Sequence, residues 1–335
     1  MTTLKNLIDE TTSIKNDIVE CRDNLVNILN NKGLVVNEKD NLSSLINNVN
    51  EITTSKYPPW HKYGNLWITG TDLSTARQNL DSVYVCNKVY CIGGSSNKLN
   101  ECYDVVSNKW ETKTEIPVAM STIVANVVDN KVFCITKSST GVHYIYDPLL
   151  DSWTAKSGKP IASRSGFDGS AVGTNIYYVG GGSKINECYD TLIDTWTSKT
   201  SANSIKSSHV VASAGGKVYY ASGKYSDWTT ATECYDPTTD TWTSVSNSSG
   251  NVARFNTSLT EMNGKLYSAG GIQNTEINNA WCFDPSTNIW SSIAGMPTSR
   301  GHLTLASDGK RLFAIGGYKY GSPAGNSKKV EIYIP

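Results

Sequence analysis

Residues 175 to 196 contain the pattern that decides the fold. The stretch Asn175-Ile-Tyr-Tyr-Val-Gly-Gly181 is followed by the pair Tyr189-Asp190 and then by Trp196, six residues after the Asp. Its first part is rich in β-branched and aromatic residues and ends in two glycines, which is typical of a strand that runs into a turn. The same pattern returns along most of the chain with a period of 43 to 48 residues.

Six tryptophans mark this repeat, and five of them follow an aromatic-Asp pair at one constant distance. The tryptophans are Trp67, Trp110, Trp153, Trp196, Trp242 and Trp290, and the pairs are Tyr103-Asp104, Tyr146-Asp147, Tyr189-Asp190, Tyr235-Asp236 and Phe283-Asp284. Turn dipeptides such as Asn263-Gly264 precede the glycine-ending stretches and favour tight hairpins. Each period therefore predicts four short antiparallel strands.

The order of strand, Gly-Gly, aromatic-Asp pair and tryptophan resembles the kelch repeat. The resemblance implies an all-β fold, a six-bladed kelch-type β-propeller with one four-stranded blade per repeat, over residues 56–335. The second repeat departs from the pattern, because Thr136-Lys137 stands where the others have the Gly-Gly pair or a close equivalent.

The two ends of the repeat region predict how the ring closes. The chain stops at Glu331-Ile-Tyr-Ile-Pro335, so the last repeat lacks its fourth strand, whereas Trp67 belongs to a fourth strand with no repeat before it. We expect the strand around Leu66-Trp-Ile68 to complete the sixth blade, which leaves no open sheet edge.

The segments between the second and third strands of each repeat vary most in length, so loop variation falls on one face of the wheel. Long loops on a rigid scaffold are common binding sites, and those of the fourth and sixth repeats are aromatic. The predicted ligand contacts are Tyr225, Trp228, Tyr318 and Tyr320. The alternative is that these side chains pack on neighbouring loops.

Four arginines stand ten to twelve residues after a tryptophan, near the start of a first strand: Arg77, Arg164, Arg254 and Arg300. The kelch resemblance implies that residues here surround the mouth of the central channel and bind hydroxyl or anionic groups. The alternative is a structural role, with bonds to loop carbonyls.

The first 55 residues differ from the rest of the chain. Apolar residues alternate at spacings of three and four between positions 4 and 28, which predicts a coiled-coil stalk. The predicted oligomerisation contacts, with a trimer as the favoured state, are Leu4, Leu7, Ile14, Ile18, Leu25 and Ile28. The segment as a whole resembles helical parts of tail and baseplate proteins of phages that infect Gram-positive bacteria.

Composition excludes several classes of protein. Thirty basic residues balance thirty acidic ones, with no basic run, so neither nucleic acid nor an anionic membrane is an expected partner. No apolar run is long enough for a membrane helix, and the acidic start does not fit a secretory signal. Four of the eight cysteines recur just before an aromatic-Asp pair, too far apart to bridge, and are expected to be buried free thiols.

No sequence motif for a metal site, a cofactor or a catalytic centre is recognisable, so the sequence predicts a binding protein without enzymatic activity. The expected role is a phage tail or baseplate receptor-binding protein, assembled in the bacterial cytoplasm and located in the virion tail or a phage-derived particle. Its partners would be a host cell-surface polysaccharide or surface protein and, through the helices, a tail or baseplate protein. Two alternatives are a cytoplasmic kelch scaffold that binds a protein and, with less support, a glycan-processing enzyme.

Overall fold

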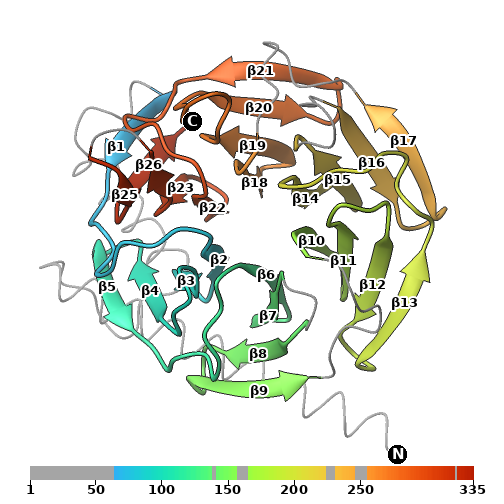
Figure 1. Cartoon of the computed structure of the whole chain (residues 1–335), viewed down its shortest axis with the longest axis horizontal. Coiled ribbons are helices and arrows are strands. Elements are labelled where there is room, and N and C mark those ends of the chain that lie inside the picture. The colour runs from blue at the N-terminus through green and yellow to red at the C-terminus, as the bar shows by residue number, and fades with distance from the viewer. Residues whose placement is uncertain (1–63, 138–140, 157–164, 224–230, 246–254, 321–322) are drawn as a thin grey trace, which may run out of the picture. The chain divides into compact units, whose positions relative to one another are not determined.

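The computed structural model describes residues 64–335 except 138–140, 157–164, 224–230, 246–254 and 321–322. The unit Asn65–Pro335 consists of six four-stranded antiparallel sheets arranged around a central axis (Figure 1). The predicted propeller and its six blades are therefore confirmed. The predicted helical stalk over residues 1–55 lies outside the described residues, as do its six oligomerisation contacts.

Each blade is a meander of neighbouring strands that runs from the channel to the rim. Blade 1 has β2 (Asp81–Val85), β3 (Lys88–Ile92), β4 (Asn100–Asp104) and β5 (Lys109–Thr112); blade 2 has β6 (Ile123–Val128), β7 (Lys131–Thr136), β8 (His143–Asp147) and β9 (Ser152–Lys156). Blade 3 has β10 (Phe167–Val172), β11 (Asn175–Gly180), β12 (Asn186–Asp190) and β13 (Thr195–Lys199); blade 4 has β14 (Val210–Ala214), β15 (Lys217–Ala221), β16 (Thr232–Asp236) and β17 (Thr241–Val245). Blade 5 has β18 (Ser258–Met262), β19 (Lys265–Ala269), β20 (Ala280–Asp284) and β21 (Ile289–Ile293).

Blade 6 joins the two ends of the propeller, as the sequence predicts. Its strands are β22 (Thr304–Ser307), β23 (Leu312–Ile315), β26 (Val330–Ile334) and β1 (Leu66–Thr69), and a small hairpin of β24 (Tyr318–Lys319) and β25 (Gly325–Asn326) lies within its long loop. Strand β1 pairs with β26 in the register that places Trp67 opposite Tyr333. In Figure 1 the blue β1 and the red β26 lie side by side.

The repeated aromatic-Asp pair and tryptophan form the outer joint between blades. The Asp caps the tight turn before the fourth strand; for example, Asp104 Oδ1 accepts bonds from the backbone N–H groups of Val106 (2.9 Å) and Ser107 (2.8 Å). The indole N–H then donates to a carbonyl of the preceding blade, from Trp110 to Thr71 at 2.8 Å. Equivalent bonds run from Trp67 to Ala294, from Trp153 to Thr114 and from Trp242 to Thr200.

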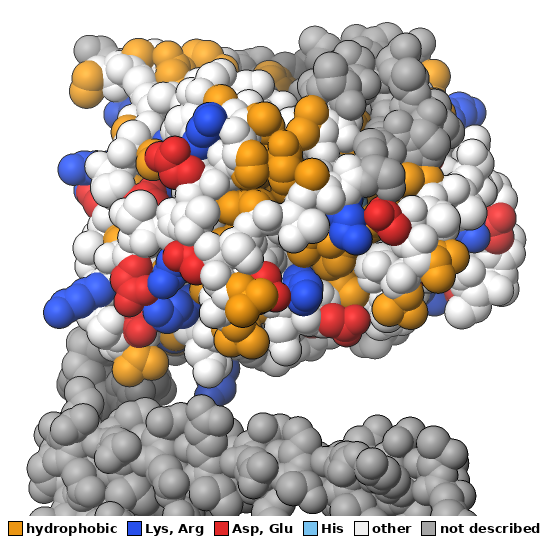
Figure 2. Space-filling model, turned by 90° about the horizontal axis from the view of Figure 1, so that it is seen from below, with side chains coloured by type: hydrophobic (Ala, Val, Ile, Leu, Met, Phe, Trp, Pro, Cys, Tyr) orange, Lys and Arg blue, Asp and Glu red, His pale blue; other side chains and the backbone are white. Residues whose placement is uncertain are grey.

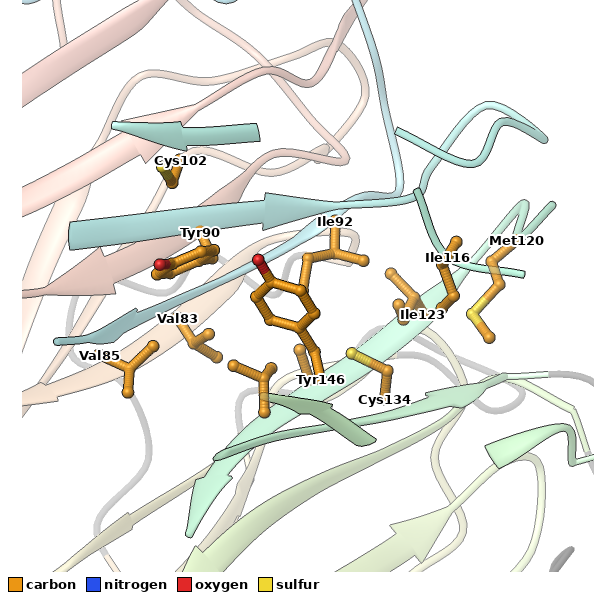
Figure 3. Close-up of a cluster of buried hydrophobic side chains, with 12 residues drawn as sticks. Val83, Val85, Tyr90, Ile92, Cys102, Ile116, Met120, Ile123, Cys134 and Tyr146 are labelled. Atoms are coloured by element: carbon orange, nitrogen blue, oxygen red, sulfur yellow. The ribbon is translucent and has the colours of Figure 1, made fainter. Parts of the chain in front are cut away.

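Apolar side chains fill the spaces between adjacent blades. Figure 3 shows one such cluster, in which Tyr90 of blade 1 lies near Tyr146 of blade 2, with ring centroids 5.6 Å apart. Each blade therefore packs mainly on its two neighbours, and no single central core exists in the described residues.

The predicted buried thiols occupy these packed layers. Cys102, Cys188 and Cys234 are free and buried, and Cys282 is free and partly buried. Burial raises the pKa of the Cys102 thiol to about 11, so it stays protonated at neutral pH. In the part of the chain that the structure describes, no helix is long and apolar enough to cross a membrane.

Candidate functional site at the channel mouth

The first strands of the six blades surround a polar cavity of about 750 Å³ along the central axis. Serine, threonine, asparagine and charged side chains line much of it, together with His209 and His302. Concave polar surfaces of this size can hold a small ligand or the end of a larger one. The end of the channel where the loops vary in length is the candidate entrance for such a ligand.

A collar of main-chain hydrogen bonds joins blades 4, 5, 6 and 1 at this end. The N–H of Asn79 donates to His302 O (3.0 Å), that of His302 to Asn256 O (2.8 Å), and that of Asn256 to Ser208 O (3.3 Å). All four residues have φ between 51° and 56°, a left-handed conformation in which asparagine is enriched. The collar thus holds these residues in equivalent positions around the mouth.

A second set of inner bonds connects neighbouring first strands. Asp81 Oδ2 accepts from the N–H of Ala125 in blade 2 (2.8 Å), and Asp168 Oδ2 accepts from that of Val211 in blade 4 (2.8 Å). Ser258 and Thr304 accept equivalent bonds from Leu305 and Ser82. The first strands therefore form a rigid channel wall, which suits a site that must keep its shape.

Tyr320 lies at the mouth and is held there by the collar. Its hydroxyl is 3.2 Å from His302 Nε2, and its backbone N–H donates to the carboxylate of Glu276 in the adjacent blade. His302 Nδ1 lies 2.8 Å from Asn79 Oδ1, and burial lowers the pKa of His302, so the ring is neutral with the proton on Nδ1. Tyr320 is nevertheless 57% exposed, and its ring contacts that of Tyr318 at 4.6 Å.

The predicted contacts Tyr318 and Tyr320 are thus brought together beside the channel as a pair of aromatic rings, of which Tyr320 is the more exposed. His302, Asn79 and Asn256 were not predicted as site residues. The sequence contains a signal for them, because each of the three stands two residues before the first residue of the first strand in its blade. Tyr225 and Trp228 lie outside the described residues and stay predictions.

Arg77 and Arg300 do not face the channel mouth. Both are fully buried, and each pairs with a buried third-strand glutamate, Glu101 and Glu331 respectively. Arg300 also donates to the carbonyls of Gly316 (2.6 Å) and Lys329 (3.0 Å). Their guanidinium groups are closed to a ligand in this structure, which corrects the predicted ligand contact and favours the structural alternative. Arg164 and Arg254 lie outside the described residues.

The glutamates that partner these bases were also missed, although the sequence contains the correlation. Blades 1, 3, 4 and 6 have a glutamate two residues before the aromatic residue of the aromatic-Asp pair, or before its equivalent Tyr333 in blade 6. In blades 1, 4 and 6 a basic residue also stands four residues before the first residue of the first strand, and it forms an ion pair with that glutamate. In blade 3 the glutamate is Glu187, and the corresponding base, Arg164, lies outside the described residues. In blade 4 the base is Lys206, whose pKa burial lowers to about 8 although Glu233 opposes the shift. A base with such a glutamate therefore indicates an interior ion pair.

The opposite wall of the channel has the charged group Lys137, Asp168 and Asp81. Lys137 Nζ lies 2.9 Å from Asp168 Oδ1. Burial raises the pKa of Asp81 to about 6, although the nearby charge of Lys137 opposes this shift. Among the described residues there is no group of three or more histidine, cysteine, aspartate or glutamate side chains arranged to hold a metal ion.

The shifted pKa of Asp81 predicts a pH dependence of stability. The folded carboxyl binds its proton more tightly than the unfolded one, with pKa 3.8, so this group's contribution is complete below pH 4 and is lost as the pH rises through 6. We expect it to change the free energy of unfolding by about 1 to 3 kcal/mol across that window. Urea unfolding between pH 4 and 7 measures it, with Asp81→Asn as the comparison; equal pH profiles for the two proteins would contradict the assignment.

The exposed aliphatic residues lie mostly on the other face, in the turns before the fourth strands of blades 1 to 3. Val106, Leu149, Leu150, Leu192 and Ile193 are between 68% and 87% exposed. A shallow cavity of about 390 Å³ between blades 2 and 3 includes Leu150 and Leu192. Figure 2 shows that hydrophobic groups on the side of the propeller are separate and have charged residues between them.

Comparison with known proteins supports the repeat assignment. The family model of the Kelch motif matches residues 253–297, which include the Gly270-Gly271 pair and Trp290 of blade 5. With the six-bladed architecture, this match supports a kelch-repeat propeller, a fold that suggests a recognition role. No curated protein matches the chain.

Proposed function

We propose that this protein is a non-catalytic recognition module that binds a carbohydrate at the channel mouth. One observation carries the proposal: Tyr320 presents an exposed ring, fixed by bonds to two blades, next to a polar channel. Aromatic rings pack on the apolar faces of sugar rings, while amides and hydroxyls bond to their hydroxyl groups. The collar supplies the amides of Asn79 and Asn256, each of which also bonds to His302 through one of its atoms.

The test is binding of the labelled full-length protein to Gram-positive cells and to their extracted wall polysaccharides. We expect strain-selective binding and a loss of about tenfold or more in affinity for Tyr320→Ala, because a central aromatic contact is removed. Tyr320→Phe should retain most of the affinity because it keeps the ring. Leu192→Ala, on the other face, should bind normally. Equal binding by Tyr320→Ala would place recognition elsewhere.

We further propose that the carbohydrate belongs to a bacterial cell surface and that the protein acts as a receptor-binding protein of a phage tail, baseplate or phage-derived particle. The support is the heptad pattern of residues 4 to 28 and the resemblance of this segment to tail and baseplate proteins. In such a particle the N-terminal segment would trimerise and attach to a tail protein. Several weak sites on one particle would then act together and raise the overall affinity.

A second candidate function is a scaffold that binds another protein. It is favoured by the exposed aliphatic turns of blades 1 to 3, two of which share a shallow cavity through Leu150 and Leu192, since exposed apolar residues beside a cavity can mark protein contacts. The same panel distinguishes the two: a protein ligand lost on Leu149→Ser/Leu150→Ser, with no binding to polysaccharide, would favour the scaffold.

A further inference from the structure

Blade 2 differs from the other five at one position on the channel wall. The equivalent residue is Gly94, Gly181, Gly223, Gly271 and Gly317 in blades 1, 3, 4, 5 and 6, and Lys137 in blade 2. A Cβ at Gly94 would lie 2.6 Å from the backbone N of Leu80, and one at Gly317 would lie 2.7 Å from Gly301 O. These blades therefore have no space for a side chain here.

The backbone of blade 2 takes a different path that makes this space. In blades 1, 5 and 6 the glycine N–H donates to a carbonyl of the following blade, as from Gly317 to Arg77 at 2.8 Å. The N–H of Lys137 instead donates to Thr122 within its own blade (3.2 Å), and its carbonyl accepts from Gly166 of blade 3 (2.9 Å). The main-chain hydrogen bonding of blade 2 therefore differs from that of blades 1, 5 and 6 at the residue whose side chain, that of Lys137, lines the channel.

Lys137 is partly exposed to the channel and has incomplete bonding. Its side chain is 25% exposed, and among the residues that the structure describes its ammonium makes one hydrogen bond, to Asp168. Asn126 of the same blade also lines the cavity and is 7% exposed. Its Nδ2 is buried without a hydrogen-bond partner among the described residues. A buried donor of this kind is costly unless a ligand or water bonds to it.

We propose that Lys137, Asp168 and Asn126 form a binding site for adjacent hydroxyl groups of a neutral sugar, in the channel below the mouth. This inference rests on the proposed function and names the part of the carbohydrate that enters. A hydroxyl both donates and accepts a hydrogen bond, so it matches a cavity whose lining includes an ammonium, an amide N–H and a carboxylate.

The charges on this wall select against acidic sugars. Two carboxylates, Asp81 and Asp168, surround one ammonium, so a uronate or a phosphate would meet an excess of negative charge in a partly desolvated channel. A neutral sugar meets no such repulsion. Only blade 2 has a lysine in place of the glycine found at this position in the other five blades. The site therefore lies on one side of the channel and gives an entering sugar a defined orientation.

The experiment uses the full-length protein on an array of neutral glycans and their uronic acid counterparts. We expect binding to a neutral glycan, and binding to its uronic acid counterpart that is weaker by tenfold or more. Lys137→Met should reduce affinity for the neutral glycan by about tenfold, since a charged hydrogen bond is lost. The matched control Lys131→Met, an exposed lysine on the other face, should bind as the unchanged protein does.

A second variant separates binding from folding, because Lys137 also connects blades 2 and 3. Asn126→Leu removes a buried donor that has no partner in the described structure, so the melting temperature should be equal or higher while the affinity falls. If Tyr320→Ala weakens binding but Lys137→Met and Asn126→Leu do not, recognition at the mouth stands and the channel site is overturned. Equal binding of uronic acids also overturns it, and binding to no glycan overturns both proposals.

Discussion

Deletion of residues 65–70 should prevent the propeller from forming a closed ring. These residues supply β1, whose four residues pair with β26, and the Trp67 indole N–H that bonds to Ala294 O at 2.6 Å. Without them β26 becomes an edge strand, and the buried Ile332 and Tyr333 lose a neighbour. We expect the loss to exceed about 5 kcal/mol, comparable to the whole stability of a typical domain, with aggregation through the exposed edge.

Thermal unfolding followed by circular dichroism measures this effect. Deletion of residues 1–60 is the matched control, because it removes a longer segment but leaves β1, and it should keep a cooperative transition at a similar temperature. Trp67→Ala should give an intermediate loss of about 3 kcal/mol. A deletion protein that melts at the same temperature as the control would contradict closure by β1.

The repeat was predictable because its physics is local and recurs. The aromatic-Asp pair specifies a tight turn, and the tryptophan spacing specifies the strand that follows, so residues within one period are enough to indicate a blade. The closing strand was also predictable, since Trp67 is a fourth strand without a repeat and Tyr333 is in a third strand without a successor. Counting strands therefore identified a contact between residues 266 positions apart.

The candidate site was only partly predictable, because it depends on contacts between blades. Tyr318 and Tyr320 were predicted as ligand contacts from loop length and aromatic character alone, and the structure brings their rings together. The arginines were assigned to the mouth by resemblance. In the structure Arg77 and Arg300 are buried and form ion pairs with glutamates of the third strands. The role of Lys137 is not visible in its own repeat, since Asp168 belongs to the next blade. Long-range partners of this kind require the assembled ring.

Glu331→Gln should be among the most destabilising single substitutions in the propeller. Arg300 is 1% exposed, and its ion pair with Glu331 at 2.8 Å supplies the only acidic partner of the guanidinium among the described residues. The substitution leaves a buried charge unpaired, and such changes cost about 3 to 5 kcal/mol. The measurement is the free energy of unfolding from urea denaturation.

Two comparisons identify the cause of that loss. Glu111→Gln removes the exposed partner of Lys88 and Lys113 and should cost less than about 1 kcal/mol, because water screens these charges. The double change Arg300→Met/Glu331→Leu removes both buried charges and should be more stable than Glu331→Gln alone, since no unpaired charge remains. If all three proteins unfold at the same urea concentration, the buried pair has no structural role, and Arg300 returns to the candidates for ligand binding.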